Sequence, residues 1–187
     1  MALFVLKPRR FNDDRGWFVE TFNQLRFAER VAPVNFVQDN QSYSVKAGTV
    51  RGMHFQKPPH AQAKLVSCLR GSILDVAVDI RISSPTYGKH VSVILSAENG
   101  KQLFIPAGFA HGLMTLEPGT EVHYKVSDFY APECEDGLLW NDPRLEIEWP
   151  IKSSDVQLSP KDTELKTLKN FISPFGYDGV PMVLSEV

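Results

Sequence analysis

Cysteine is scarce in this sequence, which contains only Cys68 and Cys134 and no Cys-x-x-Cys pair. A disulfide scaffold or a cysteine-rich zinc site is therefore not expected, and a cytoplasmic protein is the default expectation. No stretch approaches the ~18–20 apolar residues that a membrane-spanning helix needs. The apolar patch at the N-terminus is too short for a secretory signal, and its basic residues follow it. We expect no membrane partner.

An excess of charge of one sign is also missing, since 20 Lys and Arg against 22 Asp and Glu leave a formal net charge of −2. Without a strong positive field, nucleic acid is not an expected partner. Two nucleotide-binding sequences are absent as well. No Gly-x-Gly-x-x-Gly follows a strand-like run, and no Gly-x-x-x-x-Gly-Lys-Ser/Thr loop occurs. These absences argue against a Rossmann domain and a P-loop.

Alternating apolar and polar residues are the main pattern in the middle of the chain. The pattern is clearest over residues 74–81 and returns over 91–95 and 122–126. A period of two predicts half-buried strands, and residues typical of turns separate the runs. Short strands at regular spacing favour a sandwich, jelly roll or barrel. We therefore expect a mainly β fold, and 187 residues suffice for one domain with a sizeable core.

A short helix is expected before this β region. It covers roughly Asn23 to Val31, and the helical spacing places Phe22, Leu25 and Ala28 on one side. Residues three and four positions apart share a helix face.

A second helix is expected near the C-terminus, beginning at Ser159. Ser159 is suited to the N-cap, Pro160 to the first helical position, and Asp162 follows the cap by three residues. Three apolar residues with helical spacing continue the pattern, namely Leu165, Leu168 and Ile172. The tail after residue 171 is apolar but irregular and predicts no particular structure.

His54 is the first candidate for chemistry and lies in the strand-like run of residues 48–56. On a regular pleat it shares a face with Val50 and Gly52, which is the apolar side. A histidine in such a position is usually a hydrogen-bonded core residue. A buried neutral imidazole is also a good general base, because its ordinary pKa lies near 6.5. The residue alone leaves both interpretations open.

Lys64, Tyr124 and Asp162 also have ordinary structural explanations. Lys64 shares a strand face with Val66 and Cys68. It is either a snorkelling side chain at a strand end or a cation that stabilises an enolate. Tyr124 lies between two valines, as either a core tyrosine or a phenolic proton donor. Asp162 alone is explained by its place at a helix N-terminus. None of the three indicates a function without further evidence.

Two further segments help to indicate a fold and a function. Residues 104–112 contain Pro-x-Gly-x-x-His, a turn-plus-strand sequence typical of cupin barrels, and residues 13–22 place Arg15 in a turn before an aromatic strand. Together with other runs, they resemble the dTDP-4-dehydrorhamnose 3,5-epimerase family. The resemblance covers roughly residues 4–165 and rests on nine ordered runs, namely 14–18, 36–40, 50–56, 61–66, 75–81, 95–99, 105–112, 140–143 and 158–162.

The resemblance implies a cupin-type jelly-roll β-barrel with short flanking helices. Residues 1–187 are then one epimerase domain, with the C-terminal helix and tail at about 159–187. It also implies a homodimer that takes a dTDP-4-keto-6-deoxyhexose into the barrel and uses no cofactor and no metal. The expected product from dTDP-4-dehydro-6-deoxy-D-glucose is dTDP-4-dehydro-L-rhamnose.

The resemblance also assigns roles to individual residues. His54 matches the general base and Asp162 its partner, while Lys64 matches the enolate-stabilising cation and Tyr124 the acid on the opposite face. Eleven positions match the substrate-binding set: Arg15, Glu20, Gln38, Asp39, Asn40, Arg51, His111, Phe129, Tyr130, Glu135 and Lys161. Of these, Phe129 or Tyr130 is expected to stack on the thymine.

The chemistry implied by the resemblance needs these residue types. A keto group at C4 acidifies the hydrogens on C3 and C5 only weakly, so a base of near-neutral pKa and donors aimed at the developing oxyanion are required. Inversion removes a proton from one face and returns one to the other, which assigns His54 and Tyr124 to opposite sides. Arg15 and Arg51 are suited to bidentate contacts with pyrophosphate.

Three alternatives stay open. An epimerase acting at C3 or C5 only, in a related nucleotide-sugar pathway, would use the same residues. A metal-dependent cupin would need clustered ligands such as His54, His60 and His111, but no His-x-His run occurs and Lys64 is a poor neighbour for a divalent cation. A non-catalytic sugar-nucleotide-binding barrel would not need a base and an acid.

Overall fold

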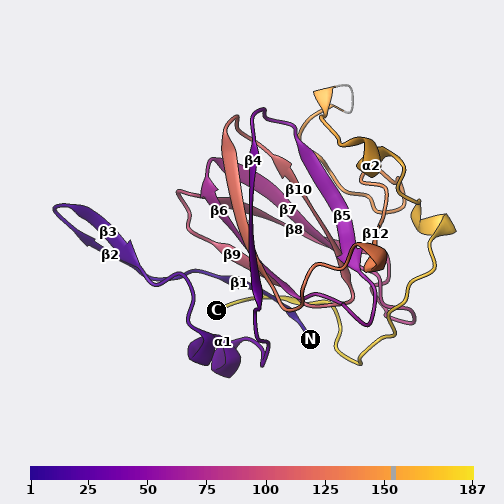
Figure 1. Cartoon of the computed structure of the whole chain (residues 1–187), viewed down its shortest axis with the longest axis horizontal. Helices are drawn as coiled ribbons and strands as arrows, with labels where there is room; N and C mark the ends of the chain where they lie inside the picture. Colours follow the sequence, from indigo (N-terminus) through magenta and orange to yellow (C-terminus); the bar gives the residue numbers. More distant parts are fainter. Residues whose placement is uncertain (153–154) are drawn as a thin grey trace.

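The computed structural model describes residues 1–152 and 155–187, and most of its regular structure is β-strand (Figure 1). Two sheets face each other. The first has the strand order β13-β1-β9-β6-β11-β4, with bounds β1 Leu3–Leu6, β4 Gln38–Ser44, β6 Lys64–Arg70, β9 Gln102–Ile105, β11 Thr120–Val126 and β13 Leu184–Glu186. The second has the order β12-β5-β10-β7-β8, with bounds β5 Val50–Gln56, β7 Ser72–Asp79, β8 His90–Ser96, β10 Phe109–Thr115 and β12 Glu135–Gly137. This architecture confirms the predicted mainly β, jelly-roll-type fold.

The core between the sheets is built by alternate residues of both. In each sheet the neighbouring strands pair antiparallel, apart from the parallel pair of β1 and β13. Because side chains alternate along a strand, one face of each sheet supplies this core. Its buried members come from both sheets: Leu3, Val5, Val66, Cys68, Ile73, Ala77, Leu95, Leu103, Ile105, Phe109, Leu113 and Val122.

The prediction of a half-buried strand over residues 74–81 is wrong in one respect, because β7 is buried on both faces. Its outward residues Val76 and Val78 pack against Leu138, Leu145 and Phe171, which follow β12 in the chain. The C-terminal part of the chain therefore covers the outer face of the second sheet. A covered antiparallel sheet loses the polar outer face that strict alternation predicts.

Helix α1 (Gln24–Arg30) lies within the expected range, and its N-cap Asn23 accepts a hydrogen bond from the backbone N–H of Arg26. The side that holds Leu25 is not the side that packs against the sheet. Leu25 is 70% exposed, whereas Phe27 is buried and forms the centre of an aromatic cluster. Phe27 contacts three other rings, those of Phe22, Phe36 and Phe104. This cluster fastens α1 to the outer face of the first sheet.

Helix α2 (Pro160–Thr163) begins as predicted, since the Ser159 hydroxyl accepts a hydrogen bond from the backbone N–H of Asp162 at 3.2 Å. It ends at Thr163, so the predicted continuation is wrong. The chain instead runs beside the segment after β12, where the Leu139 N–H donates to the Lys166 carbonyl oxygen at 2.8 Å. The described residues also form the 3₁₀ helices η1 (Pro132–Cys134) and η3 (Leu168–Asn170).

The hairpin of β2 (Arg10–Asp13) and β3 (Gly16–Val19) projects away from the two sheets (Figure 1). Trp17 is 57% exposed and Phe18 is 70% exposed. Apolar side chains of this size are costly to leave in water. No helix among the described residues is long and apolar enough to cross a membrane.

Candidate functional site

One pocket gathers seven of the fifteen site residues that the sequence singles out. It opens between the two sheets, since its walls come from β4, β6 and β11 on one side and from β5 and β12 on the other. Its lining consists of Gln38, Asn40, His54, Phe55, Gln56, Gln62, Lys64, Tyr124, Tyr130 and Glu135. Three of the four predicted catalytic residues are in this set, and the fourth, Asp162, contacts His54 directly.

A break in strand register turns His54 into the barrel. His54 lies opposite His111 on β10, but Arg51 lies opposite Leu113, so β5 holds one extra residue between them. Gly52, at φ +131°, occupies this bulge, and a Cβ there would lie 2.4 Å from the Cα of Gly112. A bulge reverses the alternation of side chains beyond it.

The predicted common face of His54 and Val50 is therefore wrong. Val50 packs outside the barrel with Met114 and Trp140. The bulge brings His54 and Arg51 to the inner face together, on the same side as Leu113 of the core. Regular alternation would have pointed these two side chains in opposite directions.

His54 and Asp162 form a close pair. The His54 Nε2 lies 2.5 Å from the Asp162 Oδ1, and Asp162 is buried. Burial alone raises the pKa of the Asp162 carboxyl, but hydrogen bonds from His54 and Ser159 outweigh it and hold that pKa below its usual value. An ionised Asp162 can only accept, so Nε2 of His54 is the donor of this hydrogen bond, and in the neutral imidazole the lone pair is on Nδ1.

Lys64 and Tyr124 lie on neighbouring strands of the opposite sheet. The Lys64 ammonium donates to the backbone oxygen of His54 at 3.4 Å. Burial lowers the pKa of Lys64 to about 8, although the charges of Asp75 and Glu135 oppose this shift. Burial raises the pKa of Tyr124, so its phenol keeps its proton at neutral pH. The pocket therefore presents a base, a cation and a proton donor.

Several predicted substrate-binding residues also meet at this pocket. Gln38, Asn40, Tyr130 and Glu135 line it, and Glu135 accepts a hydrogen bond from the Tyr130 hydroxyl at 2.8 Å. Lys161 forms an ion pair with Glu135 at the rim.

Three more of the predicted substrate-binding residues have hydrogen-bond partners in the same barrel. Arg51 donates to the backbone oxygen of Tyr43 at 3.2 Å, and the backbone oxygen of Phe129 accepts from Gln56 at 3.1 Å. His111 is buried, with its Nε2 2.7 Å from the Asp75 Oδ1.

Three further predicted substrate-binding residues have side chains that bind partners away from the pocket. The Asp39 side chain binds Lys125 at 2.9 Å on the outer face, because it alternates with Gln38 and Asn40 along β4. Arg15, at the tip of the hairpin, pairs with Asp13. Glu20, just after β3, pairs with Arg26 of α1. Figure 1 shows the hairpin on the opposite side of the molecule from α2.

Two residues at the pocket or next to it are not among the site residues predicted from the sequence. Gln56 lies two residues beyond His54 on the same face, so its amide holds the loop that carries Phe129 and Tyr130. The period of two was the signal that could have found it. Asp75 is a fully buried carboxylate on β7, and a charge inside an apolar run was its signal.

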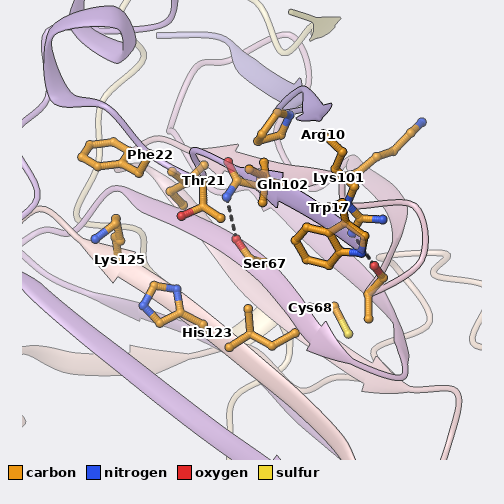
Figure 2. A pocket seen from close by; sticks show the side chains of 16 residues that line it. Arg10, Trp17, Thr21, Phe22, Ser67, Cys68, Lys101, Gln102, His123 and Lys125 are labelled. Atoms are coloured by element: carbon orange, nitrogen blue, oxygen red, sulfur yellow. Dashed lines mark hydrogen bonds between the residues drawn. The ribbon is translucent and has the colours of Figure 1, made fainter. Parts of the chain in front are cut away.

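A second pocket lies outside the barrel, under the root of the hairpin (Figure 2). Two of its polar side chains, Gln102 and Arg10, form hydrogen bonds within the chain. Gln102 donates to the Ser67 hydroxyl at 2.9 Å, and Arg10 donates to the backbone oxygen of Glu98 at 2.7 Å. Arg10 also stacks on Trp17 and so fixes the direction of the hairpin. None of the four predicted catalytic residues contributes to this pocket.

Potential metal ligands are dispersed. Among residues 1–152 and 155–187, no three His, Cys, Asp or Glu side chains lie together as a metal site requires. His60 instead faces Asp128, with 3.3 Å between Nδ1 and Oδ2. The three histidines named for a metal-dependent cupin thus do not form such a cluster among these residues.

Comparisons with known proteins agree with this geometry. The family model described as dTDP-4-dehydrorhamnose 3,5-epimerase matches residues 1–170. The dTDP-4-dehydrorhamnose 3,5-epimerase of Sinorhizobium fredii is 51% identical over 173 residues, which are 92% of this chain and 88% of that protein. The enzyme of the same name from Escherichia coli is 50% identical over 91% of each chain.

A solved structure and a more distant relative extend the comparison. The dTDP-6-deoxy-D-glucose-3,5-epimerase of Legionella pneumophila, solved in complex with dTDP-4-keto-L-rhamnose, has a TM-score of 0.87 and 44% identity over 92% of each chain. A dTDP-4-dehydrorhamnose 3-epimerase of Streptomyces niveus is 37% identical over 87% of this chain and 78% of its own. The chain therefore belongs to the dTDP-4-dehydrorhamnose 3,5-epimerase family of isomerases.

Proposed function

We propose that the protein inverts C3 and C5 of dTDP-4-dehydro-6-deoxy-D-glucose and so forms dTDP-4-dehydro-L-rhamnose. The observation that carries this proposal is the pocket in which His54, paired with Asp162, faces Lys64 and Tyr124. The names of relatives about 50% identical support the substrate and both centres of inversion. The ligand of the Legionella structure supports the product.

In this proposal His54 removes the proton next to the 4-keto group. Asp162 stabilises the imidazolium that forms, and Lys64 stabilises the oxyanion on the former keto oxygen. Tyr124 returns a proton from the other side. His54 lies on β5 and Tyr124 on β11, so the two groups come from opposite sheets, as inversion requires.

No hydride carrier takes part, because the carbon skeleton is neither oxidised nor reduced. A proton leaves and a proton returns at each centre, and the electron pair stays in the enolate between the two steps. The proposal accordingly includes no cofactor and no metal. It places the protein in the cytoplasm as one domain over residues 1–187, in which Cys68 and Cys134 stay free thiols.

The direct test follows deuterium during turnover. Purified protein, dTDP-4-keto-6-deoxyglucose and EDTA are combined in deuterium oxide and monitored by NMR. We expect deuterium at both C3 and C5 of an L-configured product, with no loss of rate in EDTA. Deuterium at one carbon only would assign the protein to the epimerases that invert a single centre. The Streptomyces niveus relative carries the name of such an enzyme. Tight dTDP binding without any exchange would instead indicate a binding module.

The proposal also includes a homodimer in which the hairpin of one copy completes the pocket of the other. Arg15 and Glu20 lie outside the pocket of their own chain, although the resemblance places them at the substrate. The hairpin exposes Trp17 and Phe18, and Arg10 holds it in a fixed direction. A rigid apolar arm that carries a ligand-binding arginine is suited to inserting into a second copy.

Mixing two impaired variants tests this arrangement. Arg15→Ala removes the arm contact, and His54→Ala removes the base. If the arms are exchanged, each mixed dimer contains one complete site. An equal mixture should then recover about one quarter of wild-type activity, since half of the dimers are mixed. Activity is measured well below the KM, where loss of a binding residue has its full effect.

The matched control mixes His54→Ala with Lys64→Ala, two residues of the same barrel. That mixture should stay inactive, because no barrel in it is complete. Native mass spectrometry confirms that mixed dimers have formed. If the mixture containing Arg15→Ala also stays inactive, Arg15 does not act across the dimer. A monomer by light scattering would overturn the homodimer itself.

A further inference from the structure

Asp75 is a buried carboxylate that uses one of its two oxygens. It lies on β7 between Ile73 and Ala77 of the core, so its side chain points into the barrel. Its Oδ1 lies 2.7 Å from the His111 Nε2. Its Oδ2 is buried and has no hydrogen-bond partner in the part of the chain that the structure describes. A buried charged oxygen without a partner is costly and requires an explanation.

Lys64 is a cation whose donors are also largely unused. In the described residues its ammonium makes one hydrogen bond, to the backbone oxygen of His54, and forms no salt bridge. An ammonium has three donors, so two remain available. The two carboxylates whose charges act on Lys64 are Asp75 and Glu135. Glu135 is already occupied by Tyr130 and Lys161, which leaves Asp75 as the uncommitted counter-charge.

We propose that Asp75 is a positioning residue of the epimerisation, which keeps Lys64 protonated and holds His111 as the neutral tautomer that donates from Nε2. The inference rests on the proposed function for the role of Lys64. With Nε2 engaged, Nδ1 of His111 is left as an acceptor for a substrate hydroxyl. One carboxylate thereby sets the protonation state of two residues around the pocket.

The sign of the effect on Lys64 follows from the surrounding charges. Burial lowers its pKa to about 8, and the negative charge of Asp75 opposes that shift. The other groups that face it are His54 on β5, His111 on β10, Tyr124 on β11 and Glu135 on β12. Removing the charge of Asp75 lowers the pKa of Lys64 further, so the ammonium loses its proton at a lower pH.

The first measurement is a titration without substrate, which does not depend on the proposed function. Lysine signals are followed by NMR from pH 6 to 10, and Lys64 is assigned by its loss in Lys64→Met. Asp75→Asn should lower the midpoint of Lys64 by about one pH unit or more. An unchanged midpoint would overturn the proposal. If Asp75→Asn fails to fold, NMR spectra of the ring nitrogens of wild-type His111 test the proposal instead. A proton on Nδ1 of His111 would overturn the proposal as well.

The second measurement is the pH profile of deuterium exchange at C3 and C5. The loss of activity at high pH should move to lower pH by the same amount in Asp75→Asn. The matched control is Asp79→Asn, a buried carboxylate on the same strand that binds Arg81, Ser84 and Thr86 instead. Its profile should keep the wild-type position whatever its stability. Equal displacement in both variants would reduce Asp75 to a structural role.

The two measurements separate the possible failures. A wild-type protein that exchanges no deuterium contradicts the proposed function, while the shift of the Lys64 titration still decides the role of Asp75. A wild-type protein that is active but has the same pH profile in Asp75→Asn contradicts the inference alone.

Discussion

Replacing His54 by alanine should lower turnover by on the order of 10³–10⁴-fold without unfolding the protein. The imidazole is the one group in the pocket with both a near-neutral ordinary pKa and a carboxylate partner, Asp162, at 2.5 Å. Its loss removes the base and leaves water in its place. Binding of dTDP should change little, because the proposed function assigns the nucleotide to other residues. Rates of deuterium exchange and dTDP affinity are measured on the same preparation.

The control is His90→Ala, which removes another half-buried imidazole from a strand of the same sheet. His90 bonds the backbone oxygen of Leu145 at 2.9 Å and lies outside the pocket. This variant should cost stability but keep turnover within a fewfold of the wild type. Near-normal turnover in His54→Ala would remove His54 as the base, whereas equal losses in both variants would point to a folding defect.

Asp162→Asn should lower turnover by roughly 10²–10⁴-fold, because it changes the protonation of His54 rather than its position. In the proposed mechanism the carboxylate accepts a hydrogen bond from Nε2–H of His54 and stabilises the imidazolium that forms during the reaction. An amide carries no charge, and its NH₂ can donate to Nε2 and so move the proton to Nδ1. The measurement is the exchange rate together with the tautomer of His54 by NMR.

A second buried aspartate provides the matched variant. Asp142 is also buried and accepts hydrogen bonds from backbone N–H groups of Arg144 and Leu168 without contacting His54. Asp142→Asn should lower the melting temperature and leave turnover per folded molecule unchanged. If Asp162→Asn kept wild-type turnover, the pair with His54 would be structural only.

Much of the fold follows from local patterns, and the errors have identifiable causes. Alternation located β7, β8 and β11, but it did not reveal that β7 is covered on its outer face by residues far along the chain. Capping residues predict the start of α2 correctly. Its end depends on the pairing of the following residues with the segment around Leu138, and helical spacing in the sequence cannot predict that pairing.

The site was less accessible to local reasoning. His54 and Asp162 are 108 positions apart, and no spacing rule brings them together. The residues alone left His54 as a core histidine or a base, and the resemblance supplied the choice between them. A regular pleat, which assumes no bulge, also predicts the wrong neighbours for His54. The bulge at Gly52 cannot be predicted from β5 alone, because it depends on the partner strand as well as on the glycine.

The facing glycines Gly52 and Gly112 have a consequence for transplanting this chemistry into another protein. A Cβ on Gly52 would lie 2.4 Å from the Cα of Gly112, and a Cβ on Gly112 would lie 2.4 Å from the sulfur of Met53. The direction in which His54 points therefore depends on two positions that bear no functional group. A designer who copies His54, Asp162, Lys64 and Tyr124 onto another jelly roll without this glycine pair would leave the base on the wrong side of the sheet.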